Sequence, residues 1–355
     1  MGLPFSRFAV EGNASFWHNM KNSYSSINDV AKAAGVTKST VSNVFSGQSF
    51  VSKELTKKVL AAAKKLDYTP GFFAAGLSGK RNNDIIGLFL ESTKNEYLNY
   101  FDVFVGAVLR VASQAKKRVL IFIGLSNEEF LQSLRAKTTP MAGVILVNPV
   151  FDDARVNQLK KDELPVVLLG KPMFSAPRRL KYVDVDNEGL VGAVVRILKE
   201  AGHQKIAFIH ANENMTLGLV QRQAFDKAIP ECKDLAYPMY VGDVEESYDL
   251  AQRALSHNAT AIICANPNSA RGAYRAIKDC GKRVGKDVAV FSLGASSASE
   301  AGFHPSLSYA SQNYAKLGGA AAKMLIAMVD HKETRSHLVI KNKIMIGNSF
   351  FVLKK

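Results

Sequence analysis

The sequence has few cysteines and no long apolar run, and both absences exclude classes of protein. Its three cysteines, Cys232, Cys264 and Cys280, are widely spaced and form no CxxC pair. This spacing argues against a disulfide framework or a zinc site and favours small thiols in a reducing compartment. No stretch of about 18 apolar residues occurs, so we expect no membrane partner. Residues 1–19 lack a signal-peptide pattern, and a cytoplasmic protein is expected.

The residue patterns of enzymes and cofactor sites are also missing. The sequence has no nucleophile–His–acid set, no zinc-ligand spacing and no phosphate-binding glycine loop, so we expect no enzyme and no cofactor. The Gly-Lys pair in GLSGKR lacks the spacing of a P-loop. His203 precedes a predicted strand, where a structural role is expected.

Acidic residues are scarce relative to basic ones. The chain of 355 residues holds 46 Lys and Arg against 31 Asp and Glu, which gives a formal net charge of +15. An excess of this size predicts an acidic partner, and nucleic acid is the commonest. Residues 21–81 contain ten Lys or Arg and three acids, so the basic density is highest near the N-terminus.

Three short helices are predicted in this basic region. Ser26, Thr37 and Ser52 can each cap a helix, because a hydroxyl accepts a hydrogen bond from free backbone N–H groups. Gly35 can take the left-handed conformation that ends the first helix. Two helices joined through Gly35 have helix-turn-helix character, although an ordinary helical hairpin has the same pattern. The predicted helices cover residues 27–34, 38–45 and 53–65.

From residue 84 onwards, apolar runs of four to seven residues alternate with helical stretches. Continuous apolar strands separated by helices predict parallel sheets that are covered on both faces. Their number suits two doubly wound lobes, with ligands bound at the carboxyl ends of the strands, in the cleft between the lobes. The predicted strands are 85–90, 118–124, 143–147, 165–170, 205–210, 261–264 and 288–294. The predicted helices are 100–116, 127–135, 153–161, 187–201, 218–228, 247–256, 269–280 and 314–329.

The stretch INDVAKAAGVTKSTVSNVFSG, residues 27–47, resembles the head signature of the LacI/GalR family of bacterial transcriptional regulators. VSKELTKKVLAAAKKLDYTP is similar to the later headpiece helices of that family, and AAGLSGKRNNDIIGLFL to its hinge and first core strand. AGHQKIAFI, NPNSARGAYRAI and PSLSYASQNYAKLGGAAAKML are similar to its core signatures. The resemblance implies a DNA-binding regulator, a repressor, of a carbohydrate-metabolism operon.

The architecture implied by the resemblance is α plus α/β. It consists of an N-terminal three-helix helix-turn-helix headpiece, a hinge, and a two-lobed core of doubly wound parallel sheets that resembles periplasmic binding proteins. The first 24 residues are expected to be a disordered extension, with Met20 as the true start. The expected divisions are headpiece 25–69, hinge 70–83, N-lobe 84–162 with 310–332, and C-lobe 163–309 with 333–355.

The resemblance implies a homodimer on a pseudo-palindromic double-stranded DNA operator in the nucleoid. Lys38, Ser39 and Asn43 fall on the base-reading positions, and lysine suits guanine while asparagine suits adenine. Asn43 replaces the arginine usual there, which changes the expected half-site. Ser39 and Ser42 could instead contact phosphates or cap the helix. Lys57 and Lys58 could instead belong to a solvated helix face. Phosphate or supporting contacts are assigned to Thr37, Thr40, Ser42, Ser52 and Lys57, with Lys58 beside them.

Leu77 matches the hinge leucine that family members insert into the minor groove, where an apolar wedge bends DNA. Gly71, Gly76 and Gly79 lie around it. Each glycine inside a helix costs about 1 kcal/mol relative to alanine, so we expect a hinge that folds only on DNA. The alternative is a flexible linker with Leu77 packed on the core.

The resemblance implies a small effector, a sugar or sugar derivative, in the cleft. Gln221 stands where sugar-sensing members carry an arginine, and Pro267 where they carry an aspartate. Arg222 is one helical step, about 100°, away from the first of these positions. These replacements leave open a regulator gated by a phosphocarrier protein, as in the catabolite-control members. Residues expected to line the cleft are Tyr97, Asn99, Tyr100, Asn148, Asp152, Lys171, Gln221, Arg222, Asn266 and Ser296.

Overall fold

The computed structural model divides into two compact units, within residues 1–82 and 83–355. The described residues are 25–46, 50–68, 84–90, 101–135, 141–175, 180–240, 243–295 and 302–353. The expected N-terminal extension with Met20, the hinge with Leu77, and the cleft residues Tyr97, Asn99, Tyr100 and Ser296 lie outside these ranges.

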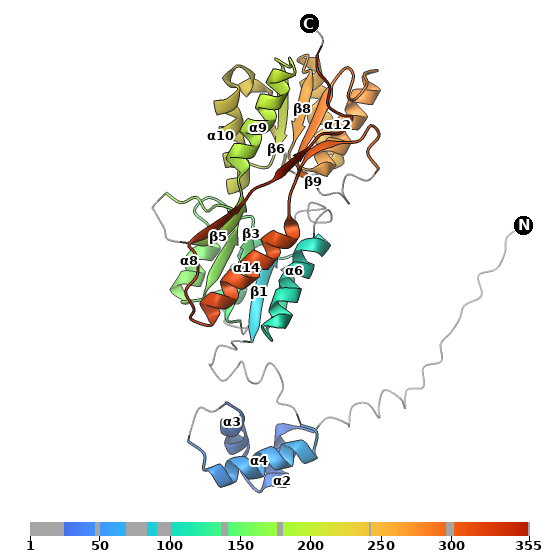
Figure 1. The fold of residues 1–355 in the computed structure, drawn as a ribbon. Helices are drawn as coiled ribbons and strands as arrows, with labels where there is room; N and C mark the ends of the chain where they lie inside the picture. Colours follow the sequence, from blue (N-terminus) through green and yellow to red (C-terminus); the bar gives the residue numbers. More distant parts are fainter. Residues whose placement is uncertain are drawn as a thin grey trace, which may run out of the picture. The chain divides into compact units, whose positions relative to one another are not determined.

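The second unit contains two six-stranded sheets, one in each lobe (Figure 1). The first sheet has the order β11-β5-β4-β3-β1-β2, and all of its strand pairs are parallel. Its strands are β1 (Ile85–Leu90), β2 (Arg118–Ile123), β3 (Gly143–Val147), β4 (Val166–Leu169), β5 (Lys181–Val185) and β11 (His337–Ile340). Each apolar run predicted in this region forms a strand, which confirms the parallel-sheet prediction.

The second sheet has the order β12-β10-β9-β8-β6-β7 and is parallel except for β12, which pairs antiparallel with β10. Its strands are β6 (Ile206–His210), β7 (Ala236–Pro238), β8 (Ala261–Cys264), β9 (Ala289–Ala295), β10 (Ser308–Ser311) and β12 (Lys343–Met345).

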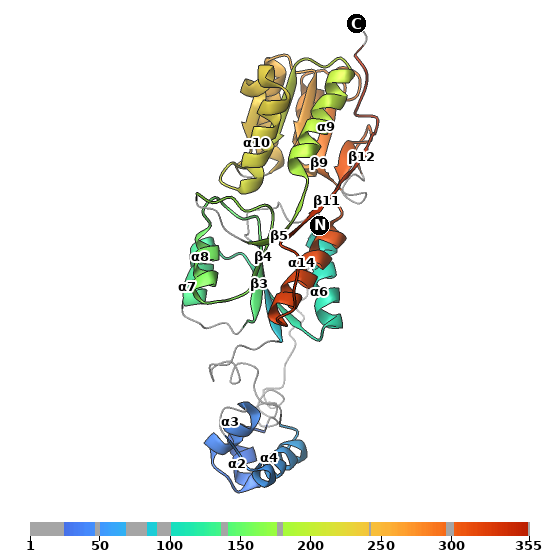
Figure 2. The ribbon, with the colours of Figure 1, turned by 60° about the vertical axis from the view of Figure 1, so that its left-hand side comes forward.

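Helices cover both faces of each sheet (Figure 2). In the first lobe, α6 and α14 pack on one face, and α7 and α8 lie on the other. Gly318 lets α14 lie close to α6, because a Cβ at this position would collide with the carbonyl oxygen of Phe104. In the second lobe, α9 and α10 cover one face, and α11 and α12 the other. The bounds are α6 (Phe101–Gln114), α7 (Asn127–Arg135), α8 (Ala154–Lys161), α9 (Asn187–Glu200), α10 (Thr216–Ala228), η2 (Pro230–Leu235), α11 (Val244–Ser256), α12 (Pro267–Asp279) and α14 (Tyr314–Val329).

The lobe boundaries differ from the expected ones. The division after residue 162 is wrong, because β4 and β5 continue the first sheet beside β3. The segment 333–355 is divided between the lobes, since β11 pairs with β5 and β12 pairs with β10. The described chain therefore passes between the lobes after β5, between β10 and α14, and between β11 and β12 (Figures 1 and 2).

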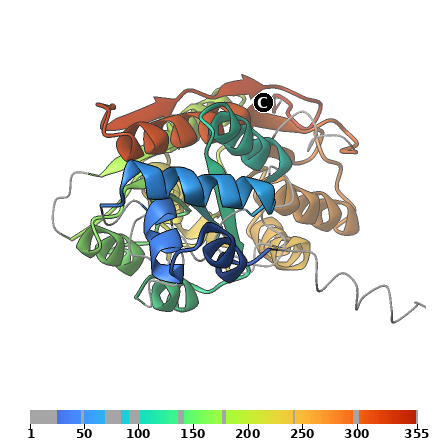
Figure 3. The same cartoon turned by 90° about the horizontal axis from the view of Figure 1, so that it is seen from below.

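The first unit contains the three predicted helices, α2 (Ile27–Ala34), α3 (Lys38–Ser46) and α4 (Lys53–Lys65). They lie across one another in Figure 3, where they are drawn in blue. Their inner faces meet around Val30, Val41 and Val59, which have no exposed surface.

The helix ends of the first unit form as predicted. The hydroxyl of Ser26 accepts from the N–H of Asp29 at 3.3 Å, and that of Ser52 from the N–H of Leu55 at 3.3 Å. The hydroxyl of Thr37 accepts from the N–H of Thr40 at 3.2 Å. Gly35 has φ +64° and ends α2 in the left-handed conformation.

Among the described residues, no helix combines the length and the apolar character that crossing a membrane requires. Cys232, Cys264 and Cys280 are unpaired, and the first two are buried. His203 is buried, with its ring nitrogens 3.1 Å from the hydroxyl of Thr260 and from the carbonyl oxygen of Phe351. The ring therefore joins the start of the second sheet to the C-terminal segment, as its expected structural role requires.

Candidate functional site

Helix α3 presents polar side chains on the face opposite its buried side. Val41 is fully buried against the other helices, whereas Lys38, Ser39 and Ser42 are exposed and Asn43 is half-buried. Positions three and four apart lie on one side of a helix, so these four polar residues share a face. The three expected base-contact residues are therefore presented together.

The start of α3 is held by a small hydroxyl cluster. The hydroxyl of Thr37 lies 2.8 Å from that of Ser39 and 2.9 Å from that of Thr40. This geometry agrees with the capping interpretation of these residues. A hydroxyl has one donor and two acceptor positions, so Ser39 keeps capacity for a contact with DNA. Lys57 and Lys58 are exposed on α4.

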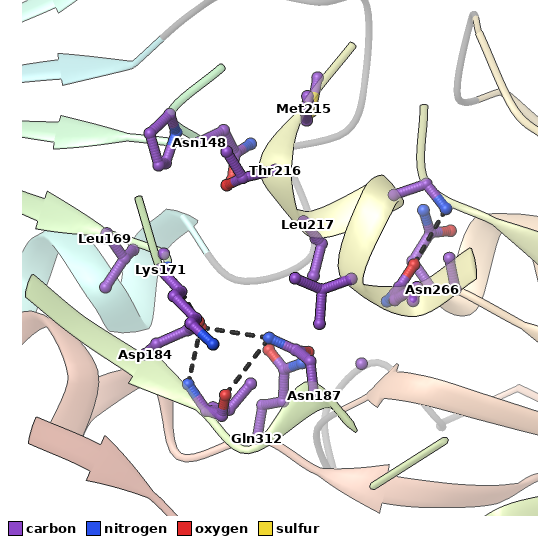
Figure 4. Close-up of a pocket in the computed structure, with 18 of the residues that line it drawn as sticks. Asn148, Leu169, Lys171, Asp184, Asn187, Met215, Thr216, Leu217, Asn266 and Gln312 are labelled. Carbon is purple, nitrogen blue, oxygen red and sulfur yellow. Dashed lines mark hydrogen bonds between the residues drawn. The ribbon is translucent and has the colours of Figure 1, made fainter. Parts of the chain in front are cut away.

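The second unit contains a cavity between its lobes, shown in Figure 4. Its lining comes from the carboxyl ends of strands in both sheets and from the first turns of the helices that follow them. This is the place where doubly wound sheets bind ligands. Four of the residues expected in the cleft line it: Asn148, Lys171, Gln221 and Asn266.

Two other expected residues are not brought to the cavity. The carboxylate of Asp152 accepts from the N–H of Ser175 at 2.9 Å, in the loop between β3 and α8. The guanidinium of Arg222 donates to the carboxylate of Asp226 at 2.9 Å. The rotation of about 100° per residue along α10 turns Arg222 away while the neighbouring Gln221 reaches the lining.

Among the lining residues that were not expected, three carry a carboxylate or amide side chain: Asp184, Asn187 and Gln312. Asp184 lies in β5, whose sequence KYVDV mixes polar and apolar residues and was therefore not predicted as a strand. Asn187 begins α9 directly after that strand, and Gln312 follows β10. A polar residue near the end of a strand is the signal that could have identified each of them.

Asp184 is the one carboxylate in the described lining of the cavity. Its Oδ2 accepts from the main-chain N–H of Lys171 at 2.9 Å. Its Oδ1 accepts from the N–H of Val185 at 2.8 Å and from Nδ2 of Asn187 at 3.2 Å. Burial raises the pKa of this carboxyl to about 6, and these donors and the charge of Lys171 oppose the rise. Figure 4 shows Lys171, Asp184 and Asn187 grouped together.

The second lobe and the segment that leads into α14 contribute amides. Oε1 of Gln221 accepts from the N–H of Ala211 at 3.0 Å, and Oδ1 of Asn266 caps α12 through the N–H of Ser269 at 2.9 Å. Nε2 of Gln312 donates to the carbonyl of Leu293 at 3.3 Å. Within the described residues, Nε2 of Gln221, Nδ2 of Asn266 and Oε1 of Gln312 keep no hydrogen-bond partner, so each can bind a ligand.

The two lobes touch beside the cavity. Val150 of the first lobe and Met215 of the second form an isolated antiparallel bridge, and the N–H of Thr216 donates to the carbonyl of Pro149 at 3.0 Å. Gly218 keeps α10 close to the preceding loop, because a Cβ there would collide with the carbonyl of Asn212. The start of α10 therefore forms part of the cavity wall and part of the contact between the lobes.

Comparison with known proteins identifies the chain. Residues 26–71 match the family model "Bacterial regulatory proteins, lacI family", and residues 195–350 match the model "Periplasmic binding protein-like domain". Together the two models span more than half of the sequence. The chain belongs to the lacI family of bacterial regulatory proteins. This lacI-family protein is a DNA-binding transcriptional regulator, as are its relatives, and not an enzyme.

Curated relatives match this lacI-family regulator over nearly its whole length. The HTH-type transcriptional regulator CelR of Thermobifida fusca is 26% identical over 338 residues, covering 90% of this chain and 96% of CelR. The catabolite control protein A of Streptococcus mutans is 26% identical over 326 residues, covering 89% of this chain and 95% of that protein. The ribose operon repressor of Haemophilus influenzae is 26% identical over 337 residues, covering 92% of this chain and 98% of that repressor.

Solved structures share the fold. A CelR–cellobiose complex has a TM-score of 0.68 at 24% identity, covering 92% of this chain and 99% of CelR. A lac repressor dimer bound to operator and the anti-inducer ONPF has a TM-score of 0.71 at 22% identity, with the same coverage. These likenesses confirm the predicted fold class, a helix-turn-helix headpiece with a core like that of periplasmic binding proteins.

Proposed function

We propose that this lacI-family regulator is a repressor of a carbohydrate-metabolism operon, gated by a sugar or sugar derivative in the cavity between its lobes. It acts in the cytoplasm, on operators in the nucleoid. The observation that carries the proposal is the cavity itself, whose polar groups meet at the carboxyl ends of strands from both sheets. A ligand there contacts both lobes and can shift the balance between two lobe arrangements.

In this proposal α3 reads the operator from the major groove. Lys38, Ser39 and Asn43 contact bases, and their common face on α3 supports the assignment. Ser52 caps α4 and presents its N-terminal N–H groups, to which a DNA phosphate can bind. Leu77, outside the described residues, is proposed to enter the minor groove. Supporting or phosphate contacts are proposed for Thr37, Thr40, Ser42, Ser52 and Lys57.

A homodimer is proposed through the edge of the first sheet. Within the described residues, β2 pairs only with β1, and its other edge is open. Leu120 and Ile123 on this strand are 38% and 54% exposed, and Val103 and Leu109 on the adjacent α6 are 42% and 43% exposed. An apolar edge strand of this kind favours association with another chain. A second copy of the chain would place two headpieces on the two halves of a palindromic operator.

The effector is proposed to contact lining residues from both lobes. These are the expected Asn148, Lys171, Gln221 and Asn266, together with Asp184, Asn187 and Gln312. Two similar proteins, CelR in a complex with cellobiose and a repressor of a ribose operon, support a sugar as the class of ligand.

A protein-gated regulator is the second candidate. It is favoured by the neutral side chains of Gln221 and Pro267 in the cavity wall and by the likeness to a catabolite control protein. In that case a phosphocarrier protein, rather than a sugar, would change the affinity for DNA.

The first experiment selects operator sequences from randomised duplex DNA with the full-length protein. A pseudo-palindromic site is expected, and its binding is then titrated with sugars and, separately, with a phosphocarrier protein. A selected sequence without two-fold symmetry would contradict the proposed dimeric operator. If only the phosphocarrier protein changes the affinity for the operator, the second candidate function is the better one.

The dimer is tested with Ile123→Asp, measured by sedimentation. A monomer is expected, because the charge would be buried in the proposed interface. Val352→Asp is the control, since Val352 is 64% exposed but lies in the C-terminal segment. Loss of the dimer in both variants, or in neither, would contradict the proposed interface.

A further inference from the structure

The charged side chains in the described lining of the cavity both come from the first lobe. Lys171 follows β4 and Asp184 lies in the neighbouring β5, whereas the second lobe contributes uncharged polar and apolar side chains. The strongest polar recognition in this cavity is therefore concentrated on one wall.

Asp184 lines the cavity and keeps an acceptor position beyond the three donors that it binds. A carboxylate offers about four acceptor positions, and three N–H groups of Lys171, Val185 and Asn187 occupy three of them. Oδ2 accepts only one of these bonds. Because all three neighbours are donors, they hold the carboxyl as an ionised acceptor rather than as a protonated donor. A ligand group that completes this arrangement must itself donate a hydrogen bond.

Lys171 supplies the complementary function. Its side chain is exposed at the cavity and forms no ion pair with any described residue, while its charge lowers the pKa of Asp184. An ammonium has three donors and no acceptor, so a ligand group that binds it must accept a hydrogen bond. The wall therefore offers one acceptor and one donor next to each other.

We propose that Asp184 and Lys171 recognise two neighbouring hydroxyl groups of a neutral sugar or polyol. The inference rests on the proposed function, because it names the class of ligand for the same cavity. A hydroxyl both donates and accepts, so two adjacent hydroxyls satisfy the carboxylate and the ammonium together. A phosphate or carboxylate on this part of the ligand would lie beside Asp184, and an amine would lie beside Lys171. Each added charge would be repelled by one of the pair.

The opposite wall fits the rest of such a molecule. Nε2 of Gln221 and Nδ2 of Asn266 can donate to further hydroxyl oxygens, and Leu217 and Val220 offer apolar contact to C–H groups of a ring. None of these four side chains carries a charge that would favour an ionised sugar.

The test uses the full-length protein and two matched sets of probes. The neutral set is D-glucose, D-ribose, cellobiose and myo-inositol. The charged set is D-glucose 6-phosphate, D-ribose 5-phosphate, D-glucuronate and D-glucosamine. Binding is measured by thermal shift and titration calorimetry. At least one neutral probe is expected to bind, and every charged probe is expected to bind at least about tenfold more weakly than that neutral probe.

Two variants assign the binding to the proposed pair. Asp184→Asn keeps the size of the side chain and removes the charged acceptor, and a loss of about 10- to 100-fold in affinity is expected. Lys171→Met is expected to cost about tenfold. The matched controls are Asp162→Asn and Lys161→Met at the exposed end of α8, away from the cavity, and they should bind the probe like the wild type.

Binding to the selected operator is measured for every variant without probe. Tighter binding of any charged probe than of the best neutral probe, unchanged affinity in Asp184→Asn, or no binder in the neutral set would each overturn the inference. If operator binding is normal in those cases, the proposed function as a DNA-binding regulator is unaffected and only the assignment of the ligand is wrong. If the wild type selects no operator, the proposed function itself fails.

Discussion

The main-chain N–H of Lys171 lies 2.9 Å from Oδ2 of Asp184 and donates to it. The bond fastens the loop after β4 to the neighbouring strand β5, so the two charged residues of the cavity wall are fixed relative to each other. Burial nevertheless raises the pKa of the Asp184 carboxyl to about 6. Keeping this group ionised near pH 7 therefore lowers the stability of the fold, as expected for a residue placed for binding.

The first prediction concerns stability against pH. The pKa of Asp184 rises from 3.8 to about 6 on folding, so the folded state holds this proton more tightly than the unfolded state. The stabilisation of the folded state by the protonated Asp184 carboxyl is fully present below about pH 4 and is lost as the pH rises through 6. The unfolding free energy of the wild type, minus that of Asp184→Asn, should fall by about 2–3 kcal/mol between pH 4 and pH 7.

The comparison with Asp184→Asn cancels the other titrating groups. Tyr182, whose pKa is raised above its usual value by burial, stays protonated over this range. Urea unfolding at several pH values measures the difference. A difference that is the same at pH 4 and pH 7 would show that the carboxyl is not desolvated in the folded protein.

The second prediction concerns the buried ion pair behind the cavity wall. Arg155 and Asp153 are each 1% exposed, and Nη2 of Arg155 lies 2.6 Å from Oδ2 of Asp153. Nη2 of Arg155 also donates to the carbonyl of Asn148, a lining residue, at 3.4 Å. Arg155→Leu would leave Asp153 buried and unpaired, at a cost of about 3–5 kcal/mol in unfolding free energy.

The control for this pair is Arg283→Leu. Arg283 forms an ion pair of similar length with Asp287, 2.8 Å, but its side chain is 68% exposed. Exposed pairs contribute little, so this variant should unfold almost like the wild type. Denaturant unfolding of both variants checks the prediction, and equal losses in the two would mean that the burial of Arg155 is not the cause.

The third prediction separates base reading from phosphate contact in the first unit. Asn43→Ala should cost about 1–3 kcal/mol on the selected operator and relax the preference at one base pair. Lys57 lies on the exposed side of α4, and Lys57→Ala should weaken binding to all sequences alike. It should also reduce the slope of log binding constant against log salt concentration by about one. Salt titrations on operator and random duplexes distinguish the two. A uniform loss from Asn43→Ala would contradict its assignment to a base edge.

The sequence predicts the elements of this fold better than their grouping into lobes. Apolar runs such as IIGLFL and GVILV become fully buried central strands, because continuous apolar residues suit a sheet covered on both faces. Strands β5, β11 and β12 were missed because their mixed or half-exposed residues resemble loops, and β7 and β10 were missed because they span only three and four residues. The expected lobe boundary after residue 162 is wrong because the predicted strand β4, together with the missed β5 and β11, belongs to the first sheet.

The same reason limits the prediction of the site. Asn148, Lys171, Gln221 and Asn266 follow or face predicted strand ends and were expected in the lining. Asp184 was not, because its strand was not recognised. Arg222 was included although it is one residue from Gln221 along α10, and its helical rotation directs it to Asp226. Which of two neighbouring helical residues faces the cavity depends on how the helix is rotated against the sheet. The sequence pattern does not specify that rotation.

The last prediction tests the contact between the lobes. The N–H of Thr216 donates across to the carbonyl of Pro149, and Thr216 is the first residue of α10, where a helix tolerates proline. Met215 before it has φ −93° and ψ 145°, a conformation that also suits the residue before a proline. Thr216→Pro therefore removes this one donor without breaking the helix. The amide hydrogens of Asn148, Val150, Met215, Leu217 and Gly218 should exchange faster, because the free energy of local opening falls by about 1 kcal/mol. Thr216→Val, which keeps the N–H and the side-chain shape, should exchange like the wild type. Equal exchange in the proline and valine variants would mean that this bond does not hold the lobes together.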